Sequence, residues 1–123
     1  MSRHSTKRRL STPPTSKAHL WDAHQACLAA LSFVEGIDVH EFQVNLLVQS
    51  AVERQLEILG EALNRLRRTD AQTAAEVPDL DRIIGMRNII AHEYGIVDHA
   101  IVWAVVDTRL SPLAARLAVL LGD

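Results

Sequence analysis

The sequence predicts an all-α protein, an up-and-down bundle of four or five helices in one domain. The composition favours helix over sheet: 48 % of the 123 residues are apolar and 4 % are aromatic, with only 5 Gly and 4 Pro. Apolar residues recur at spacings of three and four along most of the chain, which is the period of an amphipathic helix. The connections between these stretches are short, as they are between antiparallel neighbours in a bundle.

Residues 1–16 are expected to form a disordered basic arm, followed by a helical domain over residues 17–123. The arm is rich in Ser, Thr, Pro and basic residues and ends in Pro13-Pro14-Thr15-Ser16, a sequence typical of a helix N-cap. Two roles stay open for it: a solubilising leader and an arm that binds RNA.

The first helix is predicted over residues 17–34, and Gly36 is a fitting stop after it. Its apolar stripe has the spacing 4, 3, 4, 3 and consists of Leu20, His24, Cys27, Leu31 and Val34. The histidine in this stripe is interpreted as a tolerated core or interface residue, because no carboxylate or second histidine stands at helical reach of it.

A long second helix is predicted over residues 40–67. Its main stripe comprises Val48, Val52, Leu56, Leu59, Leu63 and Leu66. A second apolar set widens the expected buried face and comprises Val44, Leu47, Ala51, Ile58 and Ala62. A helix this broadly apolar in so small a chain indicates that another protomer covers part of it.

Acidic residues repeat on the same helix at Glu53, Glu57 and Glu61, and Glu61 can pair with Arg65 at i, i+4. One reading is a solvated face. The sharper reading is that Glu57 or Glu61 faces Arg87 and holds its guanidinium in place.

Residues 69–78 form a polar connection with one short turn expected over residues 70–75. The third helix is predicted over residues 79–94. Asp79 and Asp81 favour its positive N-terminus, and Gly95 suits its C-terminal cap.

Two more helices are predicted after residue 97. Asp98 caps the first of them, and a last helix begins at Pro112, after the N-cap Ser111, and runs to residue 121. The residues expected to face inward from the first are Ile101, Val102, Val105, Val106 and Leu110.

The distribution of cysteine and charge limits the compartment and the partners. A single cysteine excludes an internal disulfide, and with no signal peptide the expectation is a cytoplasmic protein. No apolar run approaches the roughly 20 residues of a membrane span, so no membrane partner is expected. Residues 1–17 hold 5 basic and no acidic residues, whereas the rest holds 8 basic and 15 acidic residues, a net charge of −7. RNA would therefore have to be held by a local basic site, by the arm or by a second subunit.

The candidate site lies in Gly85-Met86-Arg87-Asn88-Ile89-Ile90-Ala91-His92-Glu93-Tyr94-Gly95. Drawn as a helix, this segment places Arg87 in the middle of an apolar stripe, which is costly unless the guanidinium is paired or faces a wet cleft. A second, polar stripe with the spacing 4, 3, 4 comprises Asp81, Gly85, Asn88 and His92. The glycine gap in this stripe favours close approach by another molecule.

These residue types fit RNA transesterification without a metal. The imidazole of His92 in the last helical turn can move protons, the guanidinium of Arg87 suits phosphate, and Asn88 can hydrogen-bond the ring or a substrate. The spacing alone is a weak signal, because an R-x4-H pair on a helix is more often structural. No H-x3-H or HExxH spacing is present, so neither a metal site nor a cofactor is predicted.

The segment resembles the R-x4-H-x-Y signature of HepT-type proteins of the HEPN superfamily, the toxin halves of pairs with a minimal nucleotidyltransferase (MNT). Leu56-Glu57-Ile58-Leu59-Gly60-Glu61-Ala62 also resembles the corresponding helix of that family, and the resemblance covers roughly residues 18–121. It implies a homodimeric helical bundle in which Arg87, Asn88 and His92 of both protomers line a shared cleft and cleave RNA. It further implies that Tyr94, the only tyrosine, receives AMP from the MNT antitoxin.

Two other interpretations compete with a ribonuclease toxin. One is a non-catalytic HEPN module that binds nucleotide or docks a nucleotidyltransferase. The other is a purely structural dimer, which leaves Arg87 unexplained.

Overall fold

The structure is a computed structural model that describes residues 12–91 and 97–122, and for residues 87–91 it describes the backbone alone. Within these residues every regular element is a helix, which confirms the all-α prediction. The helices are α2 (Pro14–Phe33), α3 (Val39–Val44), α4 (Leu46–Thr69), α5 (Ala71–Ala74), α6 (Leu80–Ala91), α7 (His99–Thr108) and α8 (Leu110–Gly122). None of the helices in the described part of the chain is both long and apolar enough to span a bilayer.

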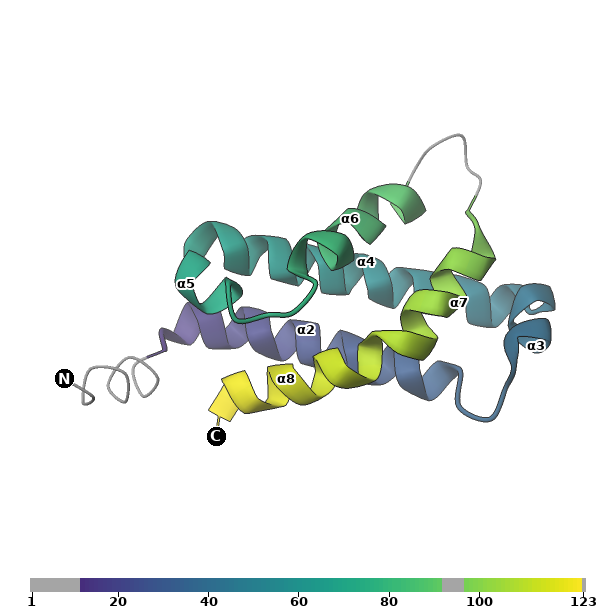
Figure 1. The fold of residues 1–123 in the computed structure, drawn as a ribbon, viewed down its shortest axis with the longest axis horizontal. Coiled ribbons are helices and arrows are strands. Elements are labelled where there is room, and N and C mark those ends of the chain that lie inside the picture. Colours follow the sequence, from purple (N-terminus) through teal and green to yellow (C-terminus); the bar gives the residue numbers. More distant parts are fainter. Residues whose placement is uncertain (1–11, 92–96, 123) are drawn as a thin grey trace.

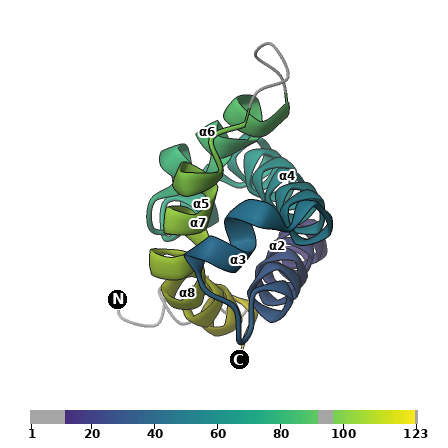
Figure 2. The ribbon, with the colours of Figure 1, turned by 90° about the vertical axis from the view of Figure 1, so that its right-hand side faces the viewer.

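The long helices alternate in direction along the bundle (Figure 1). α2 and α4 run antiparallel along the long axis, α6 runs back over α4, and α7 and α8 together form a bent fourth limb that returns along α2. Figure 2 looks along the bundle and shows α3 lying across the near end. This arrangement confirms the up-and-down bundle.

A single apolar core lies between the long helices. Its fully buried side chains come from α2, α3, α4, α6, α7 and α8, and the largest include Leu20, Phe42, Leu59, Leu63, Ile83, Val102 and Leu117. On α4, five of the six residues in the predicted stripe are buried, as the spacing of three and four requires, and Val48 is half-buried. The stripe predicted for α2 needs correction: only Leu20 and Cys27 of it are buried, and three alanines complete the buried face of this helix, at Ala23, Ala26 and Ala30. Cys27 is fully buried among them, and burial raises the pKa of its thiol to about 12.

The N-terminal boundary of α2 differs from the prediction. The helix begins at Pro14, with Pro13 at the N-cap, rather than at residue 17. Proline at the first helical position has no amide hydrogen to leave unpaired, so it fits here. Ser16, expected to end the arm, is 2 % exposed and its Oγ donates a hydrogen bond to Oδ2 of Asp70 at 2.7 Å.

The predicted second helix is two helices, which is a correction to the sequence analysis. The chain leaves the helical conformation at Asn45, whose Oδ1 accepts a hydrogen bond from the amide of Val48 at 3.1 Å and so caps α4. Gln49 Nε2 donates to the carbonyl of Phe42 at 2.8 Å and fixes the corner. Two members of the apolar set expected to be buried, Val44 and Leu47, are consequently exposed.

The exposed corner between α3 and α4 consists of Val44 (85 % exposed), Leu46 (75 %) and Leu47 (80 %). Of the other residues in that apolar set, Ala62 is buried, whereas Ala51 and Ile58 are half-buried. The exposed members of the second apolar set therefore lie around the N-terminal end of α4.

Two predictions for the C-terminal half also need correction. Val102, Val105, Val106 and Leu110 are buried as expected, but Ile101 is 44 % exposed. The last helix begins at Leu110, two residues before Pro112, because α7 passes into it with only Arg109 between them. The short turn over residues 70–75 is confirmed as α5, and Asp70 and Asp98 cap α5 and α7 with their side chains.

Candidate functional site

α6 carries the first part of the predicted site. Asp79 precedes this helix with a positive φ of 57°, and its carbonyl accepts a hydrogen bond from the amide of Ile83 at 2.9 Å. Its carboxylate pairs with Arg109 at 2.7 Å, which ties the start of α6 to the junction of α7 and α8. Ile83, Ile84 and Met86 are buried, so α6 lies with a fixed face toward the core.

The predicted catalytic residues fall at and beyond the end of this helix. Arg87 and Asn88 lie within α6, and their side chains are outside the described part of the structure. His92 and Tyr94 lie wholly outside the described residues. The meeting of guanidinium and imidazole therefore stays a prediction, as does the position of the tyrosine hydroxyl.

Gly85, the gap in the predicted polar stripe, lies in α6. Among the described residues, a methyl group built on its Cα would meet no atom within 4 Å apart from its chain neighbours and the backbone of its own helix, so the space beside it is open. The absence of a side chain here leaves room for another molecule at the helix surface, as the sequence analysis expected.

The two supporting carboxylates, Glu57 and Glu61, lie on the half-buried face of α4. Glu57 Oε1 is 3.4 Å from Nη1 of Arg54, and Glu61 Oε2 is 3.3 Å from Nη2 of Arg65, which confirms the predicted i, i+4 pair. Whether either carboxylate also holds Arg87 stays a prediction, because that guanidinium is not among the described side chains.

A groove of about 780 Å³ runs between α2 and α4 beside these carboxylates. Its lining combines Trp21, which is 55 % exposed, with the acidic Asp22, Glu57 and Glu61 and the two arginines that pair with the glutamates. With three carboxylates and two paired arginines, this groove has no net positive charge to attract a polyanion.

A cluster that the sequence analysis did not find anchors the first turn of α7. His99 Nδ1 lies 3.3 Å from Oε2 of Glu53 on α4, and the ring of Phe42 packs edge-on against His99 with 6.3 Å between centroids. Phe42 also contacts Trp103, at 5.4 Å between centroids. Burial raises the pKa of Glu53, His99 lowers it, and neighbouring Glu57 raises it again, so the net pKa is above the usual range. No sequence signal joins residues so far apart in the chain.

His24, interpreted as a tolerated core histidine, is half-buried on α2. Its Nδ1 is buried without a hydrogen-bond partner among the described residues. Within the described ranges, no three His, Cys, Asp or Glu side chains gather as a potential metal site.

Comparison with known proteins identifies a family for this chain. The family model of the HepT-like ribonucleases matches residues 23–120. A relative from Methanocaldococcus jannaschii, named "Putative RNase", is 33 % identical over 90 residues, which cover 73 % of this chain and 82 % of the relative. Another of the same description, from Caldanaerobacter subterraneus subsp. tengcongensis, is 29 % identical over 103 residues, which cover 84 % of this chain and 91 % of the relative.

No solved structure matches the chain significantly. The family match spans the helices from the middle of α2 to the end of α8 and includes the whole R-x4-H-x-Y segment. The protein therefore belongs to the HepT-like ribonuclease family.

Proposed function

We propose that this protein is a metal-independent endoribonuclease and the toxin of a type VII HEPN/MNT toxin–antitoxin pair. One observation carries the proposal: the pair Arg87 and His92, with the sequence spacing R-x4-H, occurs in a chain of the HepT-like ribonuclease family. The names of the two relatives support the same reaction class.

In the proposed reaction, a ribose 2′-oxygen attacks the adjacent phosphorus. A P–O2′ bond forms and the P–O5′ bond breaks, giving a 2′,3′-cyclic phosphate and a 5′-hydroxyl end. His92 transfers the proton that the 2′-hydroxyl loses and the 5′-oxygen gains, and Arg87 stabilises the charge that develops on the phosphoryl oxygens. The need for a 2′-hydroxyl makes the activity specific for RNA.

The proposed active form is a homodimer. Arg87, Asn88 and His92 of two protomers would line one cleft, and Glu57 or Glu61 would hold the guanidinium. A pair of protomers would provide a wet position for Arg87, which the sequence pattern places at i+4 and i+3 from the buried Ile83 and Ile84.

We further propose that an MNT-family nucleotidyltransferase neutralises the toxin by modifying Tyr94. The tyrosine oxygen attacks the α-phosphorus of ATP, and pyrophosphate leaves. Drawn as an ideal helix, the sequence places Tyr94 about two turns after Arg87 on the same stripe, so the added phosphate would compete with RNA for the guanidinium. Tyr94 is the only tyrosine in the chain, which makes the target unambiguous.

The test combines growth with product chemistry. Expression of the wild type should arrest growth, and the purified protein should release 2′,3′-cyclic phosphate ends in the presence of EDTA. Arg87→Ala and His92→Ala should each reduce cleavage by at least about 100-fold, the scale of losing a general acid–base or a charge stabiliser. Arg68→Ala is the matched control, because this arginine is exposed at the end of α4.

Growth arrest that survives both substitutions would refute the assignment of these residues. Uncut RNA alongside tight binding of ATP or of a nucleotidyltransferase would identify the non-catalytic HEPN module instead. For the regulatory half, co-expression with a neighbouring nucleotidyltransferase should add AMP to the intact mass, and Tyr94→Phe should abolish that addition.

A further inference from the structure

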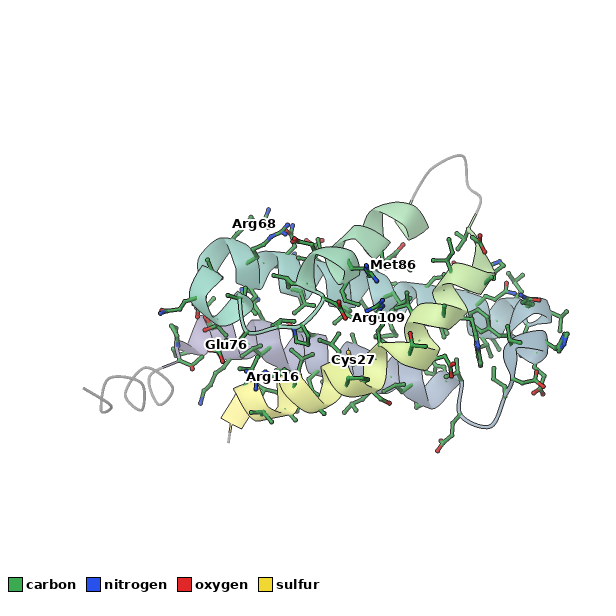
Figure 3. The ribbon with its side chains drawn as sticks, in the orientation of Figure 1. Cys27, Arg68, Glu76, Met86, Arg109 and Arg116 are labelled. Atoms are coloured by element: carbon green, nitrogen blue, oxygen red, sulfur yellow. The ribbon has the colours of Figure 1, made fainter. Side chains whose placement is uncertain are left out.

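A second groove lies between α6 and α7, on the side of α6 that carries Gly85. It has a volume of about 510 Å³, which is within the range of about 300–1,000 Å³ typical of ligand sites. Buried Met86 and Val105 contribute to its floor, and Ile101, exposed against expectation, forms part of its wall. Figure 3 labels Met86 on α6 and Arg109 at the junction of α7 and α8, two residues of this groove.

The charge of this groove differs from that of the larger groove between α2 and α4. None of the described residues that line it is acidic, whereas two arginines, Arg82 and Arg109, do so. Arg109 pairs with Asp79 through one nitrogen and keeps other donors. Arg82 is exposed and makes no ion pair with any described residue.

An apolar floor beside one guanidinium group without an ion pair, that of Arg82, and a second with donors to spare, that of Arg109, is the chemistry that holds one nucleotide of a single strand. The flat base covers aliphatic side chains, and the phosphate meets arginine. The acidic body of the domain repels a polyanion elsewhere, so a local basic groove is where a strand can be held.

The position of the groove relates it to the proposed catalytic pair. Gly85 belongs both to the groove lining and to the polar stripe that continues at Asn88 and His92. In a helix, positions 82, 85 and 86 share one face, and position 85 also lies at i−3 from Asn88. A strand that lies over Gly85 therefore passes from the groove toward the motif.

We propose that the groove between α6 and α7 binds a nucleotide of the single-stranded RNA substrate that flanks the cleaved phosphate. This inference rests on the proposed ribonuclease function and names the surface that holds its substrate. Arg82 contacts a backbone phosphate, and the aliphatic floor around Met86 receives a base.

The experiment measures binding separately from cleavage. The full-length protein is titrated against a fluorescein-labelled 12-nucleotide RNA carrying 2′-O-methyl groups, which removes the attacking hydroxyl. Gly85→Leu fills the groove, while Gly85→Ala is its matched control, since the space beside this residue is open and alanine favours helix. Arg82→Glu reverses the charge, and Arg68→Glu is its control on another helix.

We expect Gly85→Leu and Arg82→Glu to weaken binding at least tenfold, with less than a threefold effect of either control. Arg82→Ala should also reduce the slope of log affinity against log salt by about 0.7, the value for one lost phosphate contact on a single strand. Thermal melting of all variants shows that each one is folded, and a Gly85 variant should melt no lower than the wild type.

Three results would overturn the groove as an RNA site. Wild-type affinity in Gly85→Leu is one, and failure of the wild type to bind the probe while it still cleaves RNA is another. The third is a lowered mass by light scattering in Gly85→Leu, which would assign the groove to a second copy of the chain. Binding that depends on the groove with no cleavage of unmodified RNA would leave this inference standing and refute the proposed function.

Discussion

Replacing Ser16 with alanine removes the hydrogen bond that ties the start of α2 to α5. Its Oγ donates to Oδ2 of Asp70 at 2.7 Å from a position that is 2 % exposed. A hydrogen bond to a charged group contributes about 1.5–3 kcal/mol. The lower end applies here, because Asp70 still accepts hydrogen bonds from Thr73 Oγ1 at 2.7 Å and from its amide at 3.1 Å.

The gain in helix propensity from serine to alanine offsets about 0.5 kcal/mol of that loss. The expected net destabilisation is therefore about 1 kcal/mol in the free energy of unfolding at pH 7. Ser32→Ala is a matched control at the other end of α2. Its Oγ donates only to a carbonyl three residues earlier on an exposed surface, so that variant should be within about 0.5 kcal/mol of the wild type.

The loss should depend on pH. Burial alone would raise the pKa of Asp70, but the hydrogen bonds from Ser16 and Thr73 outweigh it and hold the pKa below its usual value. A lowered carboxyl pKa gives stability that is fully present above the unfolded value, about 3.9, and is lost as the pH falls through the folded value. The difference between wild type and Ser16→Ala should accordingly shrink between pH 7 and pH 3.

Urea unfolding followed by circular dichroism at both pH values measures this directly. Equal midpoints for Ser16→Ala and Ser32→Ala at pH 7 would refute the reasoning, as would a difference that stays constant down to pH 3. A truncation provides a second check: removal of residues 1–17, which takes Ser16 away with its hydrogen bond to Asp70, should lower the midpoint.

Two further predictions concern titratable groups whose pKa is raised, the buried Cys27 and the half-buried Glu53. Cys27, with its pKa raised to about 12, should react with a thiol reagent at pH 8 about 1,000-fold more slowly in the native protein than in urea; equal rates would show that the thiol is accessible. Glu53→Gln should raise the urea midpoint at pH 7, because a raised carboxyl pKa makes the ionised form unfavourable above the folded pKa, and the gain should fade as the pH drops toward 4.3. A lower midpoint for Glu53→Gln at pH 7 would mean that the contact with His99 outweighs the cost of burial.

Periodicity was sufficient to predict the bundle, since it reports which face of a helix is apolar. It was insufficient at Asn45, because the apolar spacing continues on both sides of the break. The interruption depends on two side-chain hydrogen bonds, from the amide of Val48 to Asn45 and from Gln49 to the carbonyl of Phe42. Asparagine is a favoured N-cap, but inside an unbroken apolar period it also fits the polar face of one continuous helix, so its presence alone did not mark the break.

The two grooves could not be predicted from the sequence either, because they depend on the distances between packed helices. Ile101 has the spacing of a core residue, yet it is exposed, because what it faces depends on how far α7 stands from α6. Likewise, the contact between Glu53 and His99 follows from the packing of α7 near α4. The proposed catalytic pair, Arg87 and His92, rests on the sequence, since both the motif and the family match come from it.

The exposed corner between α3 and α4 has a practical consequence for work with the purified protein. Val44, Leu46 and Leu47 meet water there, so the chain should adhere to hydrophobic resins and to vessel walls despite a mean hydropathy of only +0.04. Leu46 and Leu47 occupy the first two positions of α4, where the helix dipole favours a negative charge. Leu47→Glu should therefore improve the yield of soluble protein after purification and its stability on storage, while the first turn of α4 stays helical.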